Sequence, residues 1–315
     1  MALRPSSPSG RLTVADLAGS RGRRRREAVI GAIFFSAAAL SVVISAAIIT
    51  SLLGEAWNFA SQVDPALLLE RGWFPQRDLY GLPTIIAGTL VIALIGMVVA
   101  TPLGLGAAVY LSEYASPRVR RTVKPILEIL AGIPSVVLGY YALTVISPTF
   151  TDAVCPGRTE IFNMLSAGIA VGILTTPLVA SVAEDAMYAV PNSLREASYG
   201  LGARKRTTSI RIVFPAAVSG IVAALILGLS RGIGETMVVA IAAGATGGSL
   251  FSVNPCEPGQ TMTAAMAALA TGSDQSRVGG LQYPSLFFVG LLLFGMTLAL
   301  NLIADAFVRR VRSRY

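Results

Sequence analysis

The chain has 315 residues, of which 54% are hydrophobic and 13% are charged, and its net charge is +8. Soluble globular domains carry about 25% charged residues, and disordered chains combine low hydrophobicity with many charges, so this composition excludes both classes. The chain has no histidine, which excludes catalytic triads, metal sites and general bases that need an imidazole. We therefore expect a polytopic membrane protein.

Six long apolar runs follow one another along the chain. Each reaches or passes the roughly 20 residues that a helix needs to cross a bilayer. Because hydrocarbon offers the backbone no hydrogen-bonding partner, runs of this kind are expected to be helical. The runs are 28–53, 84–111, 125–147, 162–182, 216–244 and 285–307. We predict an all-α fold of six transmembrane helices, the first of which is an uncleaved anchor because it follows a long polar arm and exceeds a signal-peptide core.

The basic residues alternate between the two ends of these predicted helices. Of the 25 basic residues, 20 lie in four segments, which are 1–27, 112–124, 183–215 and 309–315. Four lie in the alternate loops, which are 54–83, 148–161 and 245–284. Since cytoplasmic segments of membrane proteins carry the excess of lysine and arginine, both termini are expected in the cytoplasm. The basic excess is thereby explained by topology rather than by nucleic-acid binding.

Three regions follow from this topology. We expect a cytoplasmic basic arm over residues 1–27, a six-span membrane domain over 28–308 and a cytoplasmic basic tail over 309–315. The membrane domain contains the long cytoplasmic loop 183–215. The protein is expected in a cytoplasmic membrane as a multi-pass protein.

The two cysteines, Cys155 and Cys256, both fall in predicted external loops. The outside of a cytoplasmic membrane is an oxidising place, where disulfides form and persist. Two interpretations stay open. The cysteines form a disulfide that joins the loop after the third span to the loop after the fifth, or they are unrelated free thiols.

The cytoplasmic loop between the fourth and fifth spans contains a predicted short helix over residues 192–204. Pro191 followed by Asn192 or Ser193 is typical of a helix start, with the polar residue as N-cap. A carboxylate in the first turn, such as Glu196, suits the helix dipole, and a nearby glycine can end the helix. We expect an amphipathic helix at the cytoplasmic face that offers small and charged residues to a partner.

Arg231 lies near the middle of the fifth apolar run. An arginine at that depth costs roughly 2.5–3.5 kcal/mol on insertion scales, and charges inside a membrane are by default candidates for function. Glu235 follows four residues later, so a continuous helix would place both side chains on one face. The pair either locks two helices together or lines a water-filled or anion-conducting path, and the two roles are compatible.

The loop also resembles a known motif. The EAA loop of ABC-importer permeases has the pattern E-A-A, three residues, G, nine residues, I, one residue, L-P. The matching residues here are Glu196, Ala197, Ser198, Gly202, Ile212 and Pro215. Serine replaces the second alanine and Phe214 replaces the leucine. In that family the loop forms the coupling helix, which docks in a groove of the ATP-binding subunit.

Further stretches resemble the permeases of bacterial phosphate importers, which are type I ABC importers. They are Leu111 to Tyr114, Leu130 to Val137, Ser230 to Met237 and Gln260 to Ala264. The resemblance covers the chain from about Gly81 to the tail, whereas the N-terminal arm carries no such signature. It is shared by the two sister permeases of such importers, so which of the two this chain represents stays open.

The resemblance implies a set of partners. They are a second permease subunit, two cytoplasmic ATP-binding subunits and an external phosphate-binding protein. No G-x-x-x-x-G-K-[ST] phosphate loop is present, because neither lysine, Lys124 or Lys205, follows a glycine. We therefore expect a non-catalytic chain without a catalytic residue, a metal or a cofactor of its own, whose partners bind ATP and Mg²⁺. ATP binding would swing the spans between two states, which is alternating access.

Phosphate would suit the charges of the fifth span. The guanidinium of Arg231 matches phosphate oxygens in a bidentate way. Glu235 would hold Arg231 and moderate its charge, and Thr236 would offer a hydroxyl. Three other classes compete with this interpretation. A permease for sulfate or molybdate would have a different fifth-span motif, a secondary transporter usually shows internal repeats, and a membrane enzyme needs clustered catalytic groups, whereas the acids here are scattered.

Overall fold

The computed structural model of the protein describes residues 21–157, 160–244, 248–271 and 280–312. The predicted basic arm lies mostly outside these residues, and the predicted basic tail lies partly outside them. The chain divides into two compact units, Met1–Ser51 and Leu52–Tyr315. The described part is mostly helical, in agreement with the predicted fold class.

The first unit contains most of helix α2, Arg21–Gln62. This helix includes the whole of the predicted first span, 28–53. Alanine, isoleucine, valine, leucine and phenylalanine occupy nearly every position of that stretch, so the helix is apolar around its whole circumference. Helices that are hydrophobic all round are typical of membrane spans. Residues 25–62 are long and apolar enough to cross a bilayer.

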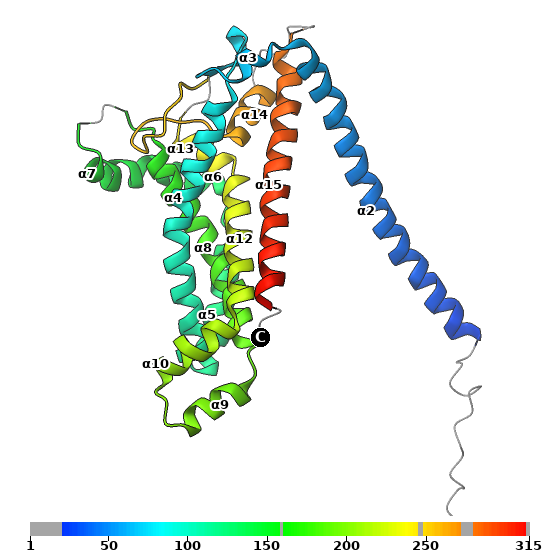
Figure 1. Cartoon of the computed structure of the whole chain (residues 1–315), viewed down its shortest axis with the longest axis vertical. Helices are drawn as coiled ribbons and strands as arrows, with labels where there is room; N and C mark the ends of the chain where they lie inside the picture. The colour runs from blue at the N-terminus through cyan, green and yellow to red at the C-terminus, as the bar shows by residue number, and fades with distance from the viewer. Residues whose placement is uncertain (1–20, 158–159, 245–247, 272–279, 313–315) are drawn as a thin grey trace, which may run out of the picture. The chain divides into compact units, whose positions relative to one another are not determined.

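Two helices that pack side by side form the centre of the second unit. They are α4, Leu82–Val109, and α8, Met164–Tyr188 (Figure 1). Small residues let helix backbones approach closely. A Cβ atom added at Gly168 would lie 2.6 Å from Cβ of Ile95, and one added at Gly172 would be equally close to the facing side chain of α4. The G-x-x-x-G spacing therefore marks the contact between these helices.

Helix α12, Val218–Ile233, packs against both helices of this pair, and α15, Gln282–Arg312, packs against α12 (Figure 1). The predicted fifth span, 216–244, is not one helix. It is broken after Ile233, and a second helix, α13, covers Met237–Ala242. Glycine has the lowest helix propensity after proline, and the break falls at Gly234. Helix α12 is preceded by a helical stretch that is bent by 72° from it. This stretch consists of α10, Lys205–Thr208, the π-helix η4, Ser209–Val213, and α11, Phe214–Ala216.

The predicted third span, 125–147, is also broken. Its first part belongs to α5, Pro117–Leu130, and its second part to α6, Ser135–Tyr141, which continues as the π-helix η3, Ala142–Thr151. The two parts are bent by 83° at the residues between them. Pro134 explains the break, because proline has no N–H and disfavours helical backbone in the residue before it. Within the described residues, four helices could span a membrane, and six spans result when each bent pair is counted once.

A small β-hairpin is a departure from the all-α prediction. Strands β1, Trp73–Phe74, and β2, Leu79–Tyr80, are antiparallel and flank a 3₁₀ turn, η1, Pro75–Arg77. Trp73 lies opposite Tyr80, and both are buried with Phe59 of α2 in one cluster. Burial and the neighbouring Asp78 raise the pKa of the Tyr80 phenol well above its usual range. The remaining short helices are α3, Pro65–Leu68, the π-helix η2, Tyr110–Tyr114, α7, Asp152–Val154, α9, Asn192–Gly200, and α14, Met262–Thr271.

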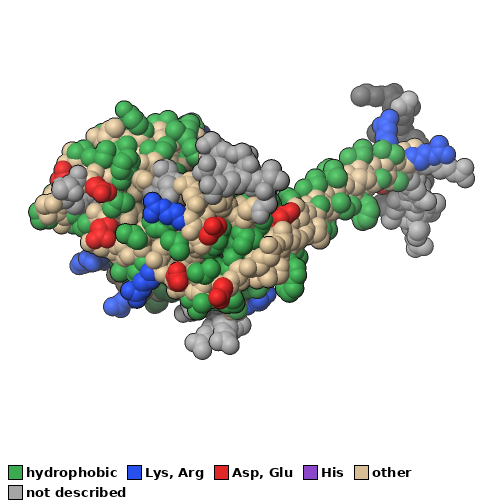
Figure 2. All heavy atoms as spheres, turned by 90° about the horizontal axis from the view of Figure 1, so that it is seen from above, with side chains coloured by type: hydrophobic (Ala, Val, Ile, Leu, Met, Phe, Trp, Pro, Cys, Tyr) green, Lys and Arg blue, Asp and Glu red, His purple; other side chains and the backbone are tan. Residues whose placement is uncertain are grey.

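The two ends of the second unit carry different features. Helices α9 and α10 lie at one end, and α3 and α14 lie at the other (Figure 1). Figure 2 looks onto the end with α3 and α14, where acidic and basic side chains are scattered among hydrophobic ones without forming a basic patch. The basic loop segments 112–124 and 183–215 belong to the α9 end, as the predicted topology requires.

Candidate functional site

The helix predicted over 192–204 is present but shorter, as α9, nine residues from Asn192 to Gly200, and Glu196 lies beyond its first turn. Its N-cap is Pro191, which offers no side-chain cap, so the expectation of Asn192 or Ser193 as N-cap is wrong. The chain turns away through Gly202, whose φ of 78° lies in the left-handed region that glycine adopts without strain. Gly202 N donates to the oxygen of Tyr199 over 2.9 Å. Glycine is therefore required where the helix ends.

The residues that match the EAA pattern divide into exposed and buried positions. Glu196 and Ala197 are exposed on α9. Ser198 is buried, and its hydroxyl lies 2.8 Å from that of Thr208 in α10. Serine in place of the second alanine therefore fastens α9 to the next helix of the loop. The last two motif residues are half-buried, Ile212 in η4 and Pro215 in α11.

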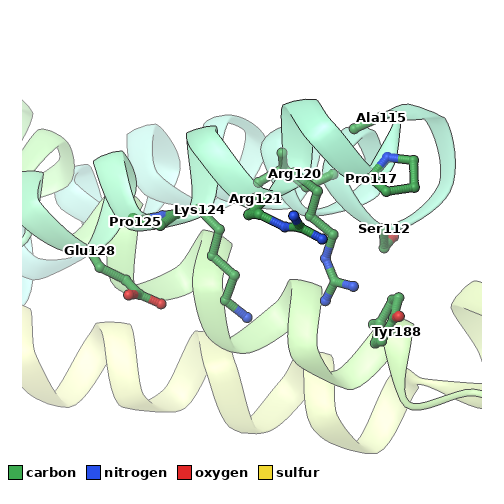
Figure 3. A pocket seen from close by; sticks show the side chains of 10 residues that line it. Ser112, Ala115, Pro117, Arg120, Arg121, Lys124, Pro125, Glu128 and Tyr188 are labelled. Atoms are coloured by element: carbon green, nitrogen blue, oxygen red, sulfur yellow. The ribbon is translucent and has the colours of Figure 1, made fainter.

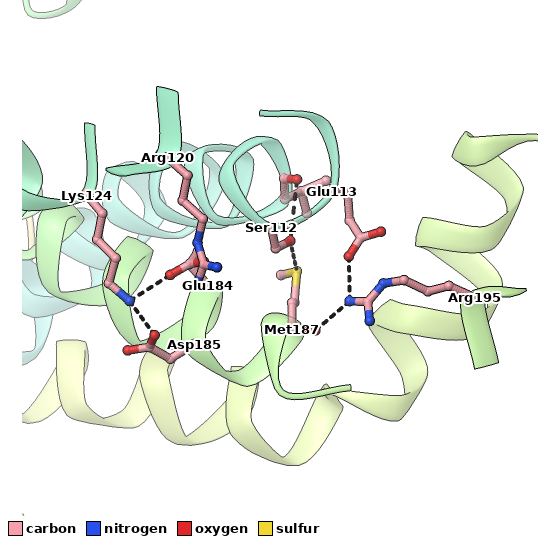
Figure 4. A network of polar contacts seen from close by, with 9 residues as sticks. Ser112, Glu113, Arg120, Lys124, Glu184, Asp185, Met187 and Arg195 are labelled. Carbon is pink, nitrogen blue, oxygen red and sulfur yellow. Dashed lines mark hydrogen bonds and ion pairs between the residues drawn. The ribbon is translucent and has the colours of Figure 1, made fainter. Parts of the chain in front are cut away.

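Arg195 attaches α9 to the body of the protein. Its Nη2 atom lies 2.8 Å from Oε1 of Glu113, which belongs to η2, a π-helix over Tyr110–Tyr114 that continues α4 (Figure 4). The Glu113 side chain is 3% exposed and the Arg195 side chain 13%. The guanidinium also donates to the backbone oxygen of Met187 in the last turn of α8, over 2.9 Å, and to that of Val190, two residues beyond the helix. One side chain thus joins three elements.

A second ion-pair network ties α5 to α8 (Figure 4). Glu184 of α8 is fully buried, with Arg120 Nη2 at 2.6 Å from one carboxylate oxygen and Lys124 Nζ at 2.8 Å from the other. Lys124 also pairs with Asp185. The Arg120 guanidinium lies 3.4 Å from the ring centroid of Tyr188. The two cations therefore neutralise a carboxylate that would otherwise be costly to bury.

A cavity of about 480 Å³ opens beside this network (Figure 3). Arg120, Arg121 and Lys124 reach into it from α5, and Tyr188 closes it from α8. A second cavity, of about 440 Å³, is lined by Glu113, Arg195 and other residues at the base of α9, and the two cavities share Ser112 and Tyr188. The α9 end of the bundle is therefore hollowed and lined with charged side chains.

Arg231 lies in the last turn of α12 with its side chain exposed. The predicted helical pairing with Glu235 is wrong, because α12 ends at Ile233 and Gly234 interrupts the helix. The Glu235 carboxylate instead accepts from Val238 N over 3.4 Å. In the part of the chain that the structure describes, no ion pair involves Arg231. Its guanidinium is therefore available to another molecule.

The structure brings two of the resembling stretches into contact. The hydroxyl of Thr263 donates to the backbone oxygen of Glu235 over 2.7 Å. A Cβ atom added at Gly88 of α4 would lie 2.4 Å from the backbone oxygen of Gln260, so that stretch also packs closely against α4. The third predicted pathway residue, Thr236, is half-buried beside the break between α12 and α13. Its hydroxyl donates to the backbone oxygen of Gly234.

Cys155 and Cys256 form a disulfide, with Cα atoms 5.9 Å apart. It joins the end of α7 to the loop before α14 across 101 residues. In that loop the Glu257 carboxylate accepts from the Ser252 hydroxyl and, over 3.0 Å, from Asn254 Nδ2. These hydrogen bonds lower the pKa of Glu257.

Sequence reasoning named none of Glu113, Glu184 and Arg195 as site residues. Glu113 lay in a resembling stretch and Arg195 in the predicted helix. The two residues pair with each other across 82 residues of sequence, and no local pattern indicates that contact. One signal was available for Glu184. It lies two residues past the end of the fourth apolar run, and α8 continues past that run to Tyr188, so the carboxylate is placed on a helix inside the bundle.

Comparison with known proteins places the chain in a family. The binding-protein-dependent transport system inner membrane component family matches residues 100–314. The phosphate transport system permease protein PstC of Pasteurella multocida is 30% identical over 292 residues, which cover 86% of this chain and 88% of that protein. The probable ABC transporter permease protein YqgH of Bacillus subtilis is 29% identical, covering 89% and 91%.

The fold has solved counterparts. A bacterial ABC transporter involved in the import of the acidic polysaccharide alginate has a similar chain, with a TM-score of 0.59, 15% identity, and coverage of 91% of this chain and 99% of that one. The MetNI methionine ABC transporter has another, with a TM-score of 0.53, 21% identity, and coverage of 79% and 99%. Together with the apolar helices and the family match, these likenesses show that the chain belongs to the binding-protein-dependent transport system inner membrane components, as a multi-pass permease subunit of an ABC importer.

Proposed function

We propose that this chain is the PstC-type permease subunit of an ATP-driven importer, which moves inorganic phosphate into the cytoplasm by alternating access. The observation that carries the proposal is the 30% identity to the PstC protein of Pasteurella multocida along 86% of the chain. The contact between Glu235 and Thr263 supports it, because it joins two stretches that resemble phosphate permeases.

The proposed complex contains a second, PstA-like permease, two PstB-like ATP-binding subunits and an external PstS-like phosphate-binding protein. This chain is non-catalytic and carries no cofactor, since ATP and Mg²⁺ bind to the PstB-like subunits. It lies in the bacterial cytoplasmic membrane with both termini in the cytoplasm. The orientation is supported by the 20 basic residues, of 25, in the segments assigned to that side.

Loop 192–215 couples the permease to the ATP-binding subunits in this proposal. Helix α9 offers the exposed Glu196 and Ala197 to a groove of such a subunit. Ser198, Gly202 and the half-buried end of the motif hold the loop in shape rather than contact the partner. ATP binding closes the ATPase pair, and the motion of α9 shifts the spans between outward- and inward-facing states.

Arg231 is the proposed phosphate contact. Among the described residues Arg231 has no carboxylate partner, so its guanidinium retains its forked donors for a phosphate dianion, which it would bind in a bidentate way. Glu235 shapes the broken segment through its contacts with Val238 and Thr263 rather than by pairing with Arg231. Thr236 stands beside the same break and would offer a hydroxyl.

Purification of the whole complex and reconstitution into liposomes tests the proposal. Uptake of radiolabelled phosphate should require external binding protein and internal ATP, and sulfate and molybdate should be neither transported nor inhibitory. Mass spectrometry should identify a second permease and an ATP-binding subunit in the purified material. Uptake of sulfate or molybdate in place of phosphate would assign a different anion importer, and uptake without an ATPase partner would assign a secondary transporter.

A further inference from the structure

Helix α9 presents two different sides. Glu196 and Ala197 are exposed, whereas Arg195 and Ser198 reach into the protein. The side that is free to contact another subunit is therefore separate from the side that holds α9 to the bundle. A force on the exposed side must pass to the spans through the contacts of the other side.

Glu113 is the residue outside α9 that pairs with Arg195 on the side of α9 that faces the protein. It belongs to η2, where Ala115 N donates to the oxygen of Tyr110 over 2.8 Å, five residues back. Such π-segments recur at functional sites and change which side chains face a neighbour. A carboxylate that is 3% exposed requires a cation, and within the described residues the ion pair recorded for Glu113 is with Arg195.

The same guanidinium closes the end of α8. A cation at a helix C-terminus hydrogen-bonds the last carbonyl oxygens and complements the helix dipole. Arg195 does both at Met187 and Val190 while it pairs with Glu113. Helices α4 and α8 pack through glycines with no room for a side chain at Gly168, so the two spans lie closely against each other.

The chain itself ties α9 closely to α8 but not to α4, which α9 reaches through the Glu113–Arg195 ion pair at η2. Three residues, 189–191, join α8 to α9, and the exit passes through Gly202 in the left-handed region. We propose that the Glu113–Arg195 ion pair is the link that makes α9 move as one body with α4 and α8, so that it sets how tightly ATP hydrolysis is coupled to transport. This inference rests on the proposed function of α9.

The test uses the complete complex in liposomes and measures the ATP hydrolysed per anion transported, together with the yield of co-purified ATP-binding subunit. Glu113→Gln and Arg195→Gln should raise the ratio of ATP to anion on the order of tenfold, the scale of a typical coupling free energy, with the yield unchanged. Arg195→Lys should give a ratio between that of the wild type and that of Arg195→Gln. An ammonium keeps the charge but lacks the forked geometry that lets one guanidinium reach all three acceptors.

Two controls separate coupling from folding. Asp305→Asn breaks an exposed ion pair with Arg309 on α15 and should leave both readouts at the wild-type value. The double variant Glu113→Gln/Arg195→Gln should be no worse than the poorer single variant, since two residues that act only through each other are not additive.

A wild-type ratio in Glu113→Gln would overturn the inference, and so would loss of the ATP-binding subunit from that variant, because the pair would then maintain docking rather than transmit motion. The ratio is taken with whichever anion the wild-type complex transports. Failure of phosphate as that anion would therefore overturn the proposed substrate without deciding the role of the pair.

Discussion

Oε1 of Glu184 lies 2.6 Å from Nη2 of Arg120, and the Glu184 side chain has no solvent exposure, whereas that of Arg120 is 21% exposed. The carboxylate is on α8 and the guanidinium is on α5, the first half of the bent third span. Lys124 completes the contact 2.8 Å from the other carboxylate oxygen. These ion pairs therefore hold α5, the basic first half of the bent span, against α8, because the buried carboxylate of Glu184 requires cations beside it.

Glu184→Gln should lower the free energy of unfolding by about 1–3 kcal/mol, because it removes the charge that two partly buried cations face. Asp185→Asn is the matched control. Asp185 pairs with the same lysine but its side chain is 62% exposed, so its loss should change stability by less than about 0.5 kcal/mol. Thermal unfolding of the purified permease in detergent measures both. If both variants lost the same amount of stability, burial of the Glu184 carboxylate would not be what makes its ion pairs stabilising.

The disulfide between Cys155 and Cys256 should stabilise the two loops that it joins. Its loss in Cys155→Ser/Cys256→Ser should cost about 2–5 kcal/mol, because it closes a long loop of the unfolded chain. A membrane-impermeant maleimide applied to intact cells measures pairing and sidedness together. The wild-type chain should be labelled only after reduction, whereas Cys155→Ser should be labelled at Cys256 without it. Labelling of the untreated wild type would show free thiols.

The helical class and the approximate places of the spans could be predicted from apolar length alone, because hydrocarbon leaves the backbone no other choice. The breaks could not. Pro134 and Gly234 interrupt apolar runs without changing their hydropathy, so 125–147 and 216–244 read as continuous. The same error placed Arg231 and Glu235 on one helical face, an argument that holds only while the helix continues.

The loop 192–215 was predicted more closely than the fifth span. A proline at its start and a glycine after its end indicate a short helix by local chemistry. What local chemistry leaves out is how the helix is held. Arg195 is fixed by Glu113, 82 residues earlier, and Ser198 by Thr208, and neither contact has a sequence pattern of its own.

Gly202→Val should damage coupling through backbone strain. A Cβ atom at Gly202 would meet nothing within 4 Å, so the effect does not come from crowding. It comes from the φ of 78°, which costs a β-branched residue about 1–2 kcal/mol or forces the loop into another path. Uptake should fall, with either ATP hydrolysis uncoupled from it or less ATP-binding subunit co-purified.

Gly200→Ala is the matched control for that variant. Gly200 is the last residue of α9, and a Cβ atom there also meets nothing within 4 Å. Its backbone is helical, where alanine is favoured over glycine by roughly 0.5–1 kcal/mol, so uptake and assembly should stay at the wild-type level. Normal transport and normal assembly in Gly202→Val would show that the left-handed turn is not needed for coupling.

Arg231→Gln should lower the initial rate of phosphate uptake by more than about tenfold if Arg231 is the phosphate contact that we propose, because it replaces a charged, forked donor with a neutral amide. Arg231 is exposed in the last turn of α12 without an ion pair in the described structure, so the change breaks no buried pair. Assembly and ATP binding should therefore remain intact. Arg231→Lys should also impair uptake, because a point charge loses the bidentate geometry. Full phosphate uptake by the glutamine variant, measured in liposomes with equal amounts of complex, would remove Arg231 from the pathway and leave the exposed guanidinium a structural role against the second permease.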